Sequence, residues 1–180
     1  MRRMKDAIDD FFSEWGQQRQ SGGWLPPLPN DIQYVYRIAR ICRLLGERLD
    51  ATCARHDMTR SQFEALAVLR RRYPLPLSAG DLMQGALLTS GSVTAMVNQM
   101  LARGWIERQA SEQDKRRIEV RLTEEGKQRI EAALSERILD NTAIAHELPA
   151  ADRIRIDALV RRLLAALEAD AAQKPSGDGA

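Results

Sequence analysis

Aromatic side chains are scarce in this chain of 180 residues, where phenylalanine, tryptophan and tyrosine together make up only 5%. Hydrophobic residues as a whole reach 44%, so aliphatic side chains must fill most of the core. No run approaches the roughly eighteen apolar residues of a membrane-spanning helix. The N-terminus turns from basic to acidic without an apolar stretch, which is unlike a secretory signal. We therefore expect a cytoplasmic protein.

Histidine and cysteine are also rare, with two of each. His56 and His146 lie far apart in the sequence, and the chain has no nucleophile elbow, phosphate loop or paired-cysteine metal motif. We therefore expect no enzyme activity, no cofactor and no metal site. Cys42 and Cys53 fall in one predicted helix, where about 1.5 Å per residue separates them by roughly 16 Å. That distance excludes a disulfide between them, and we expect both thiols to be buried.

The chain also has no large excess of positive or negative side chains. Lysine and arginine number 27 against 25 aspartate and glutamate residues, which leaves a net charge of +2. The whole molecule is therefore no polycation, and any binding to nucleic acid must come from local placement of arginine.

The most informative stretch runs from Thr89 to Thr123. Its first part has apolar residues at helical spacing, and Gly104 is placed to end that helix. Two short alternating segments follow at 105–109 and 118–122, with a charged tip at 110–117 between them. The order of helix, glycine, strand, charged loop and strand predicts a recognition helix followed by a β-wing.

A shorter helix is predicted just upstream, where Ser78 can cap it and Asp81 can reach back to the cap. Together the two helices predict a helix-turn-helix over 78–103. A small subdomain that only packs is the alternative, but such a subdomain would not need a solvated Asp-Lys-Arg-Arg tip.

These residues resemble the MarR family of multiple-antibiotic-resistance-type transcriptional regulators, and the resemblance covers roughly residues 31–168. The segment 89–94 is similar to the start of that family's recognition helix. The wing carries the most specific match, to a D-x-R-[R/K] motif and an L-T-x-x-G exit. The matching residues are Asp114, Lys115, Arg116 and Arg117, then Leu122, Thr123, Glu124, Glu125 and Gly126.

The predicted fold class is mostly α with a small β-wing, a winged helix-turn-helix flanked by N- and C-terminal dimerisation helices. The dimerising role of the terminal helices is implied by the resemblance, and their surplus of leucine agrees with it. The predicted divisions are an N-terminal extension (1–30), first core helices (31–72), the DNA-binding region (73–123), C-terminal dimerisation helices (124–170) and a disordered tail (171–180).

Within these divisions, apolar residues at helical spacing and capping residues predict further helices. They are expected over 1–20, 31–55, 59–72 and 123–148, with Pro149 as the first residue of a last one. The helix over 1–20 either covers exposed core or roofs a ligand pocket.

The recognition helix, over about 90–103, is expected to enter the major groove of DNA. Its candidate contact residues lie away from the apolar face, and they are Ser90, Ser92, Thr94, Ala95 and Gln99. In the wing, Arg116 is expected near the minor groove. The resemblance implies that Asp114 braces that arginine, and Lys115 and Arg117 are free to contact phosphates.

In the resembling family, small aromatic or phenolic anions bind between the dimer helices and the DNA-binding lobe. Its urate-responsive branch has a tryptophan in an extra N-terminal helix, an acidic residue on the second core helix and an arginine in the recognition helix. Trp15 and Glu64 match the first two features, but Met96 replaces the arginine, which argues against urate itself. The candidate effector site is therefore for a neutral or phenolic ligand at Trp15, Tyr36 and Glu64.

The sequence thus predicts a homodimeric repressor that binds a pseudo-palindromic operator in double-stranded DNA and is released by a small effector. Two alternatives stay open. One is a cysteine-based redox sensor, which Cys42 disfavours because it lies about two turns beyond the family's reactive position. The other is a winged helix that binds proteins without sequence-specific DNA.

Overall fold

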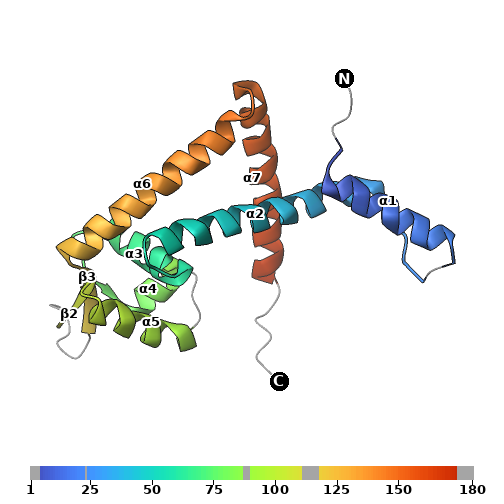
Figure 1. Ribbon diagram of the computed structural model, residues 1–180. Helices are drawn as coiled ribbons and strands as arrows, with labels where there is room; N and C mark the ends of the chain where they lie inside the picture. The colour runs from blue at the N-terminus through green and yellow to red at the C-terminus, as the bar shows by residue number, and fades with distance from the viewer. Residues whose placement is uncertain (1–4, 23, 87–89, 111–117, 174–180) are drawn as a thin grey trace. The chain divides into compact units, whose positions relative to one another are not determined.

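The computed structural model describes residues 5–22, 24–86, 90–110 and 118–173; the side chains of residues 79, 83, 86 and 90–92 are not described. Two compact units divide the chain, Met1–Glu64 and Ala65–Ala180, and the boundary falls inside helix α3 (Figure 1). Each unit is described below by itself.

In the first unit, helix α1 (Ala7–Gln20) packs on helix α2 (Gln33–Arg55). Asp6 caps α1, because its carboxylate accepts the backbone N–H of Ile8 and of Asp9, and the Asp9 carboxylate accepts the N–H of Asp6. A short 3-10 turn, η1 (Asn30–Ile32), precedes α2. The helices predicted over 1–20 and 31–55 are therefore confirmed, with later starts.

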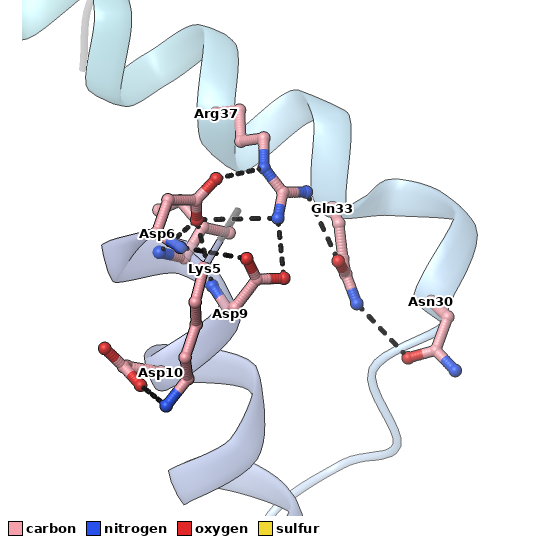
Figure 2. A network of polar contacts seen from close by, with 8 residues as sticks. Lys5, Asp6, Asp9, Asp10, Asn30, Gln33 and Arg37 are labelled. Carbon is pink, nitrogen blue, oxygen red and sulfur yellow. Dashed lines mark hydrogen bonds and ion pairs between the residues drawn. The ribbon is translucent and has the colours of Figure 1, made fainter. Parts of the chain in front are cut away.

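Rings and one arginine hold α1 to α2. Phe11 stacks on Tyr36 with ring centroids 5.5 Å apart, and Phe12 meets the same ring edge-on at 5.2 Å. The Arg37 guanidinium donates to Asp6 at 2.7 Å and to Asp9 at 2.8 Å, and Figure 2 shows both carboxylates turned toward it. The aspartates that begin α1 are thus the same ones that anchor it.

The second unit contains the predicted helix-turn-helix. Helix α3 (Arg60–Arg72) leads through strand β1 (Leu77–Ser78) into helix α4 (Ala79–Ala86) and then helix α5 (Ser90–Ala102). The predicted cap of α4 is confirmed, since Asp81 accepts the backbone N–H of Ser78 at 3.2 Å and its hydroxyl at 2.6 Å. The predicted cap of α3 is also confirmed, with reciprocal bonds between Thr59 and Gln62.

Three strands form one antiparallel sheet in the order β1-β3-β2. Strand β2 (Ile106–Ala110) pairs with β3 (Ile118–Leu122) over their full length, from Ile106 opposite Leu122 to Ala110 opposite Ile118. The sequence placed the first strand one residue too early, because Trp105 belongs to the turn after α5. The two-residue strand β1 was not predicted, since it is too short to show an alternating pattern.

The core of the second unit lies where α3, α4, α5 and the sheet converge. Its largest fully buried side chains are aliphatic apart from one methionine and one tryptophan, in line with the low aromatic content of the sequence. They are Leu66, Leu69, Leu82, Met100, Trp105, Ile106 and Ile130.

Two long helices follow the sheet, α6 (Glu124–His146) and α7 (Ala150–Gln173), joined by a three-residue turn (Figure 1). Thr123 caps α6 by accepting the N–H of Gly126, as predicted. Pro149 precedes α7 instead of being its first residue, and its carbonyl accepts the N–H groups of Asp152 and Arg153. The mostly helical fold with a small antiparallel sheet is therefore the predicted fold class.

Candidate nucleic-acid interface

Helix α5 has one buried face and one exposed face. Val93, Met96, Val97 and Met100 are at most 7% exposed, and they fix the helix on the core of the second unit. The opposite face, which meets solvent, carries Thr94, Ala95, Asn98 and Gln99.

This exposed face contains three of the five recognition-helix residues predicted to contact DNA. Thr94, Ala95 and Gln99 are all exposed, as a groove-reading helix requires. Ser90 and Ser92 belong to the first turn of α5, but their side chains lie outside the described residues. The predicted wing residues Asp114, Lys115, Arg116 and Arg117 also lie outside them.

Asn98 is a polar residue of this face that the sequence prediction missed. Its side-chain carbonyl accepts a hydrogen bond of 2.8 Å from the guanidinium of Arg108 on β2. This bond joins the recognition helix to the wing. Asn98 follows the predicted contact residue Thr94 by four residues, which puts both on one face of a helix, so the sequence could have placed Asn98 on the exposed face.

In the described part of the wing, one basic and one acidic side chain face each other across the two strands and neutralise each other. Glu107 and Arg121 lie directly opposite each other on β2 and β3, and their side chains form an ion pair of 2.7 Å. An arginine that is already paired with a carboxylate binds a phosphate less strongly than an unpaired arginine does. The basic residues of the sequence at 115–117 are therefore the better candidates for phosphate contacts.

The junction between α5 and the sheet is tightly fixed. Gly104 has φ +70°, in the left-handed region that favours glycine at a helix end. Its N–H donates to the Leu101 carbonyl, and the next N–H, of Trp105, donates to the Met100 carbonyl. These two bonds end α5 with a Schellman motif, which sets the direction in which the wing leaves the helix.

Trp105 fills the corner behind this junction and is only 1% exposed. The guanidinium of Arg103 lies 4.8 Å from its ring centroid and that of Arg129 lies 4.7 Å away. Both distances suit cation–π attraction. The ring therefore links the end of α5 to helix α6.

The predicted effector residues belong to α1, α2 and α3. Trp15 contacts Phe11 at a centroid distance of 5.6 Å and donates its indole N–H to the carbonyl of Pro26 at 2.9 Å. Tyr36 meets the same Phe11 ring, so the structure gathers Trp15 and Tyr36 into one aromatic cluster. Glu64 lies half-buried on α3, outside this cluster.

The cysteines differ from each other, which corrects one prediction. Both lie on α2, but Cys42 is exposed and only Cys53 is buried. Burial, aided by the nearby carboxylate of Asp50, raises the pKa of the Cys53 thiol above its ordinary value of 9.0. Cys53 is therefore a poor source of thiolate.

In the described parts of the chain, no group of three or more histidine, cysteine, aspartate or glutamate residues could hold a metal ion. No described helix combines the length and the apolar character needed to cross a bilayer.

A helix-turn-helix with an exposed recognition face and an adjoining β-hairpin defines a winged helix-turn-helix protein. Residues 56–117 match a family model described as "MarR family". The regulator PecS of Dickeya dadantii is 22% identical over 157 residues, which cover 87% of this chain and 92% of PecS. The helix-turn-helix region of the chain therefore matches the MarR family, and the likeness to the transcriptional regulator PecS extends over most of the chain.

Solved structures of this family share the fold. MepR, a transcription regulator of the Staphylococcus aureus multidrug efflux pump MepA, matches with a TM-score of 0.65 at 21% identity, covering 74% of this chain and 98% of MepR. A mutant MarR from E. coli matches with a TM-score of 0.62 at 21% identity, covering 78% of this chain and 99% of that one. A S. aureus MepR–DNA complex also matches, with a TM-score of 0.65 at 21% identity over 74% of this chain and 97% of that one.

Proposed function

We propose that this chain is a repressor that binds a pseudo-palindromic operator as a homodimer and is released by a small aromatic or phenolic effector. The observation that carries the proposal is the face of α5 bearing Thr94, Ala95, Asn98 and Gln99. It is polar and exposed, while the opposite face is locked into the core. Hydrogen-bonding side chains on such a face can reach base edges in the major groove.

A homodimer is supported by apolar side chains that the C-terminal helices leave in solvent. On α6, Ile138 is 61% and Leu139 is 71% exposed. Contiguous apolar patches of this kind mark association surfaces. On α7 exposed apolar residues recur at helical spacing along one face, and they are Ile156, Leu159, Val160, Leu164 and Leu167; Ile154 is also exposed but lies off this face.

A twofold dimer would explain the operator symmetry. Two copies related by a dyad present two recognition helices, and these match half-sites about one helical turn of DNA apart, roughly 34–36 Å. The MepR–DNA complex among the structural relatives supports binding to DNA. The domain divisions 1–30, 31–72, 73–123, 124–170 and 171–180 form part of the same proposal.

The proposed effector response rests on the aromatic side chains of α1 and α2. The aromatic cluster of Phe11, Phe12, Trp15 and Tyr36 offers ring faces to an aromatic ligand. Glu64, the acidic residue proposed for the same effector site, lies on α3 outside this cluster. An effector that binds one state of the dimer better than the other would shift the population away from the DNA-competent one.

The proposal is tested by fluorescence anisotropy with DNA from upstream of the protein's own gene. The same measurement uses a scrambled duplex of equal length and is repeated at several salt concentrations. A repressor of this kind binds the upstream DNA on the order of 10³-fold more tightly or better. Its affinity also falls steeply with salt, in proportion to the phosphates neutralised. Equal, weak binding to both duplexes would favour the alternative of a protein-interaction module.

A further inference from the structure

Asn98 of α5 and Arg108 of β2 form a polar pair at the place where the recognition helix meets the wing. The Nη2 group of Arg108 donates to the Oδ1 atom of Asn98 at 2.8 Å. Both side chains are exposed. The pair is therefore open to any molecule that contacts the exposed face of α5.

The register of the hairpin explains why Arg108 reaches the helix. Arg108 lies opposite Val120, and Ile106 lies opposite Leu122. Residues directly opposite each other share a face of the sheet, and so do residues two apart on one strand. The three apolar residues of this face are at most 6% exposed, because the face packs toward the core. Arg108 is exposed on the same face, so its long side chain carries the guanidinium out to α5, which packs on β2.

The hydrogen bond fixes which groups the pair presents to a ligand. A guanidinium can only donate hydrogen bonds, so the carboxamide of Asn98 must turn its oxygen toward Arg108 and its NH₂ group away. The remaining N–H groups of the guanidinium are donors as well. With the Asn98 oxygen already engaged, the pair presents hydrogen-bond donors.

Arg108 also keeps its positive charge. Its partner Asn98 is neutral, and no described carboxylate forms an ion pair with it. Arg121 on the other face of the same hairpin differs, because it pairs with Glu107 at 2.7 Å. Hydrogen bonds from a charged donor are roughly twice as strong as those between neutral groups. Arg108 is thus held in place without being neutralised.

Among the bases of DNA, guanine has the edge that suits such a pair. In the major groove guanine offers O6 and N7, which are both acceptors. Adenine and cytosine each place an amino donor there, which would face the donors of the pair. Thymine offers its O4 acceptor beside a methyl group. A unit that only donates therefore favours guanine.

We infer that Asn98 and Arg108 act together as a donor unit that selects a guanine in each half-site of the operator. Arg108 supplies charged donors to O6 and N7, while Asn98 orients the guanidinium and adds its own NH₂ group. The inference deepens the proposed function, on which it rests, because it names a base that the operator must contain. Neither residue is among the DNA contacts predicted from the sequence.

The test begins with the full-length wild-type protein and DNA from upstream of its own gene. Each guanine of the bound site is replaced in turn by 7-deazaguanine, which still pairs with cytosine but has a C–H group in place of N7. Fluorescence anisotropy gives the Kd of each duplex at one salt concentration. We expect at least one guanine whose replacement raises the Kd about fivefold or more, the lower end of the discrimination that a good bidentate contact provides. A scan in which no guanine matters would overturn the inference.

Single variants assign the sensitive guanine to the pair. Arg108→Ala is expected to bind the guanine and 7-deazaguanine duplexes equally, within about twofold, because its donors are gone. Asn98→Ala keeps the charge but loses the bond that orients it, so it should keep only part of the discrimination. Arg121→Ala is the matched control on the same hairpin and should keep all of it. All three side chains are exposed, so their removal leaves the core intact. Full discrimination in Arg108→Ala or in Asn98→Ala would overturn the inference.

The same measurements separate this inference from the proposed function. If the wild type prefers upstream DNA to a scrambled duplex but the variants keep its guanine sensitivity, the regulator proposal stands and the inference is wrong. If Arg108→Ala weakens binding to all sequences alike and lowers the salt dependence, Arg108 holds a phosphate and the inference is again wrong. If the wild type shows no preference for the upstream DNA, the proposed function fails and the inference fails with it.

Discussion

Gly126 lies against the backbone of Trp105 so closely that no side chain fits between them. A Cβ at Gly126 would stand 1.9 Å from the carbonyl oxygen of Trp105 and 2.7 Å from its carbonyl carbon. That oxygen accepts the N–H of Thr123 at 3.1 Å, and the Thr123 hydroxyl donates to the carbonyl of Gly104 at 2.6 Å. The start of α6 is thereby fixed to the end of the recognition helix.

Replacing Gly126 by alanine should destabilise the fold strongly, because the obstacle is backbone rather than a flexible side chain. We expect a loss of more than about 2 kcal/mol in the free energy of unfolding. This corresponds to a fall in Tm of at least about 5 °C. Gly16→Ala is the matched control, since nothing lies within 4 Å of its Cβ position. That change should leave Tm unchanged or raise it slightly, and an equal stability of both variants would refute the close contact.

The attachment of α1 to α2 should weaken in acid. The Arg37 guanidinium holds the pKa of Asp6 below its ordinary value of 3.8. Because this pKa is lowered in the folded state, the attachment is fully present above pH 3.8 and is lost as the pH falls through the lowered value.

Hydrogen exchange of the α1 amides, corrected for the intrinsic rate, measures this attachment. Protection in the wild type should be lower at pH 3 than at pH 6, and Arg37→Ala should remove the protection already at pH 6. Arg43→Ala is the control, because Arg43 pairs within α2, with Glu47. If Arg37→Ala keeps the protection of the wild type, the pair does not anchor α1.

Local chemistry explains why most elements could be predicted from the sequence. The caps at Thr59, Ser78 and Thr123 and the stop at Gly104 depend on a few neighbouring residues. Their patterns therefore predict helix ends even without knowledge of tertiary contacts. The exposure of Thr94, Ala95 and Gln99 followed from the apolar spacing of the same helix.

Features that depend on contacts across the chain could not be predicted in this way. The bond from Arg108 to Asn98 needs the hairpin to lie against α5, and strand β1 exists only because β3 pairs with it. Cys42 was expected to be buried because it falls on an apolar stripe, but that part of α2 is exposed.

The proposed dimer should fail when charge enters the apolar face of α7. Val160 and Leu167 are 48% and 58% exposed and lie two turns apart on that face. We expect Val160→Glu/Leu167→Glu to sediment as a monomer of 20.3 kDa and to lose operator binding, since glutamate cannot be buried cheaply in an apolar interface. The control Ala158→Glu/Ala165→Glu places the same charges at the same spacing on the opposite face. If Val160→Glu/Leu167→Glu stays dimeric, the apolar face of α7 is not the dimer interface.

Peroxide should not act through the cysteines. Cys53 is buried with a raised thiol pKa, and Cys42 has no cysteine partner on α2 within disulfide reach. Cys42→Ala and Cys53→Ala should therefore leave operator release under peroxide as it is in the wild type. If either single variant abolishes a response that the wild type shows, the redox alternative is correct.

The central claim is that the recognition helix and wing bind a specific DNA sequence, and Arg116→Ala tests it most directly. An arginine inserted into the narrow, electronegative minor groove is favoured there, so its removal should cost about 1–3 kcal/mol of operator binding. The measurement is the operator Kd at one salt concentration for the wild type, Arg116→Ala and the control Arg161→Ala. Arg161 is an exposed arginine of α7 that pairs with Asp157. The account predicts a Kd raised roughly fivefold to 150-fold for Arg116→Ala alone, with Tm unchanged. Equal losses in the two variants, or a folded Arg116→Ala protein with wild-type affinity, would contradict it.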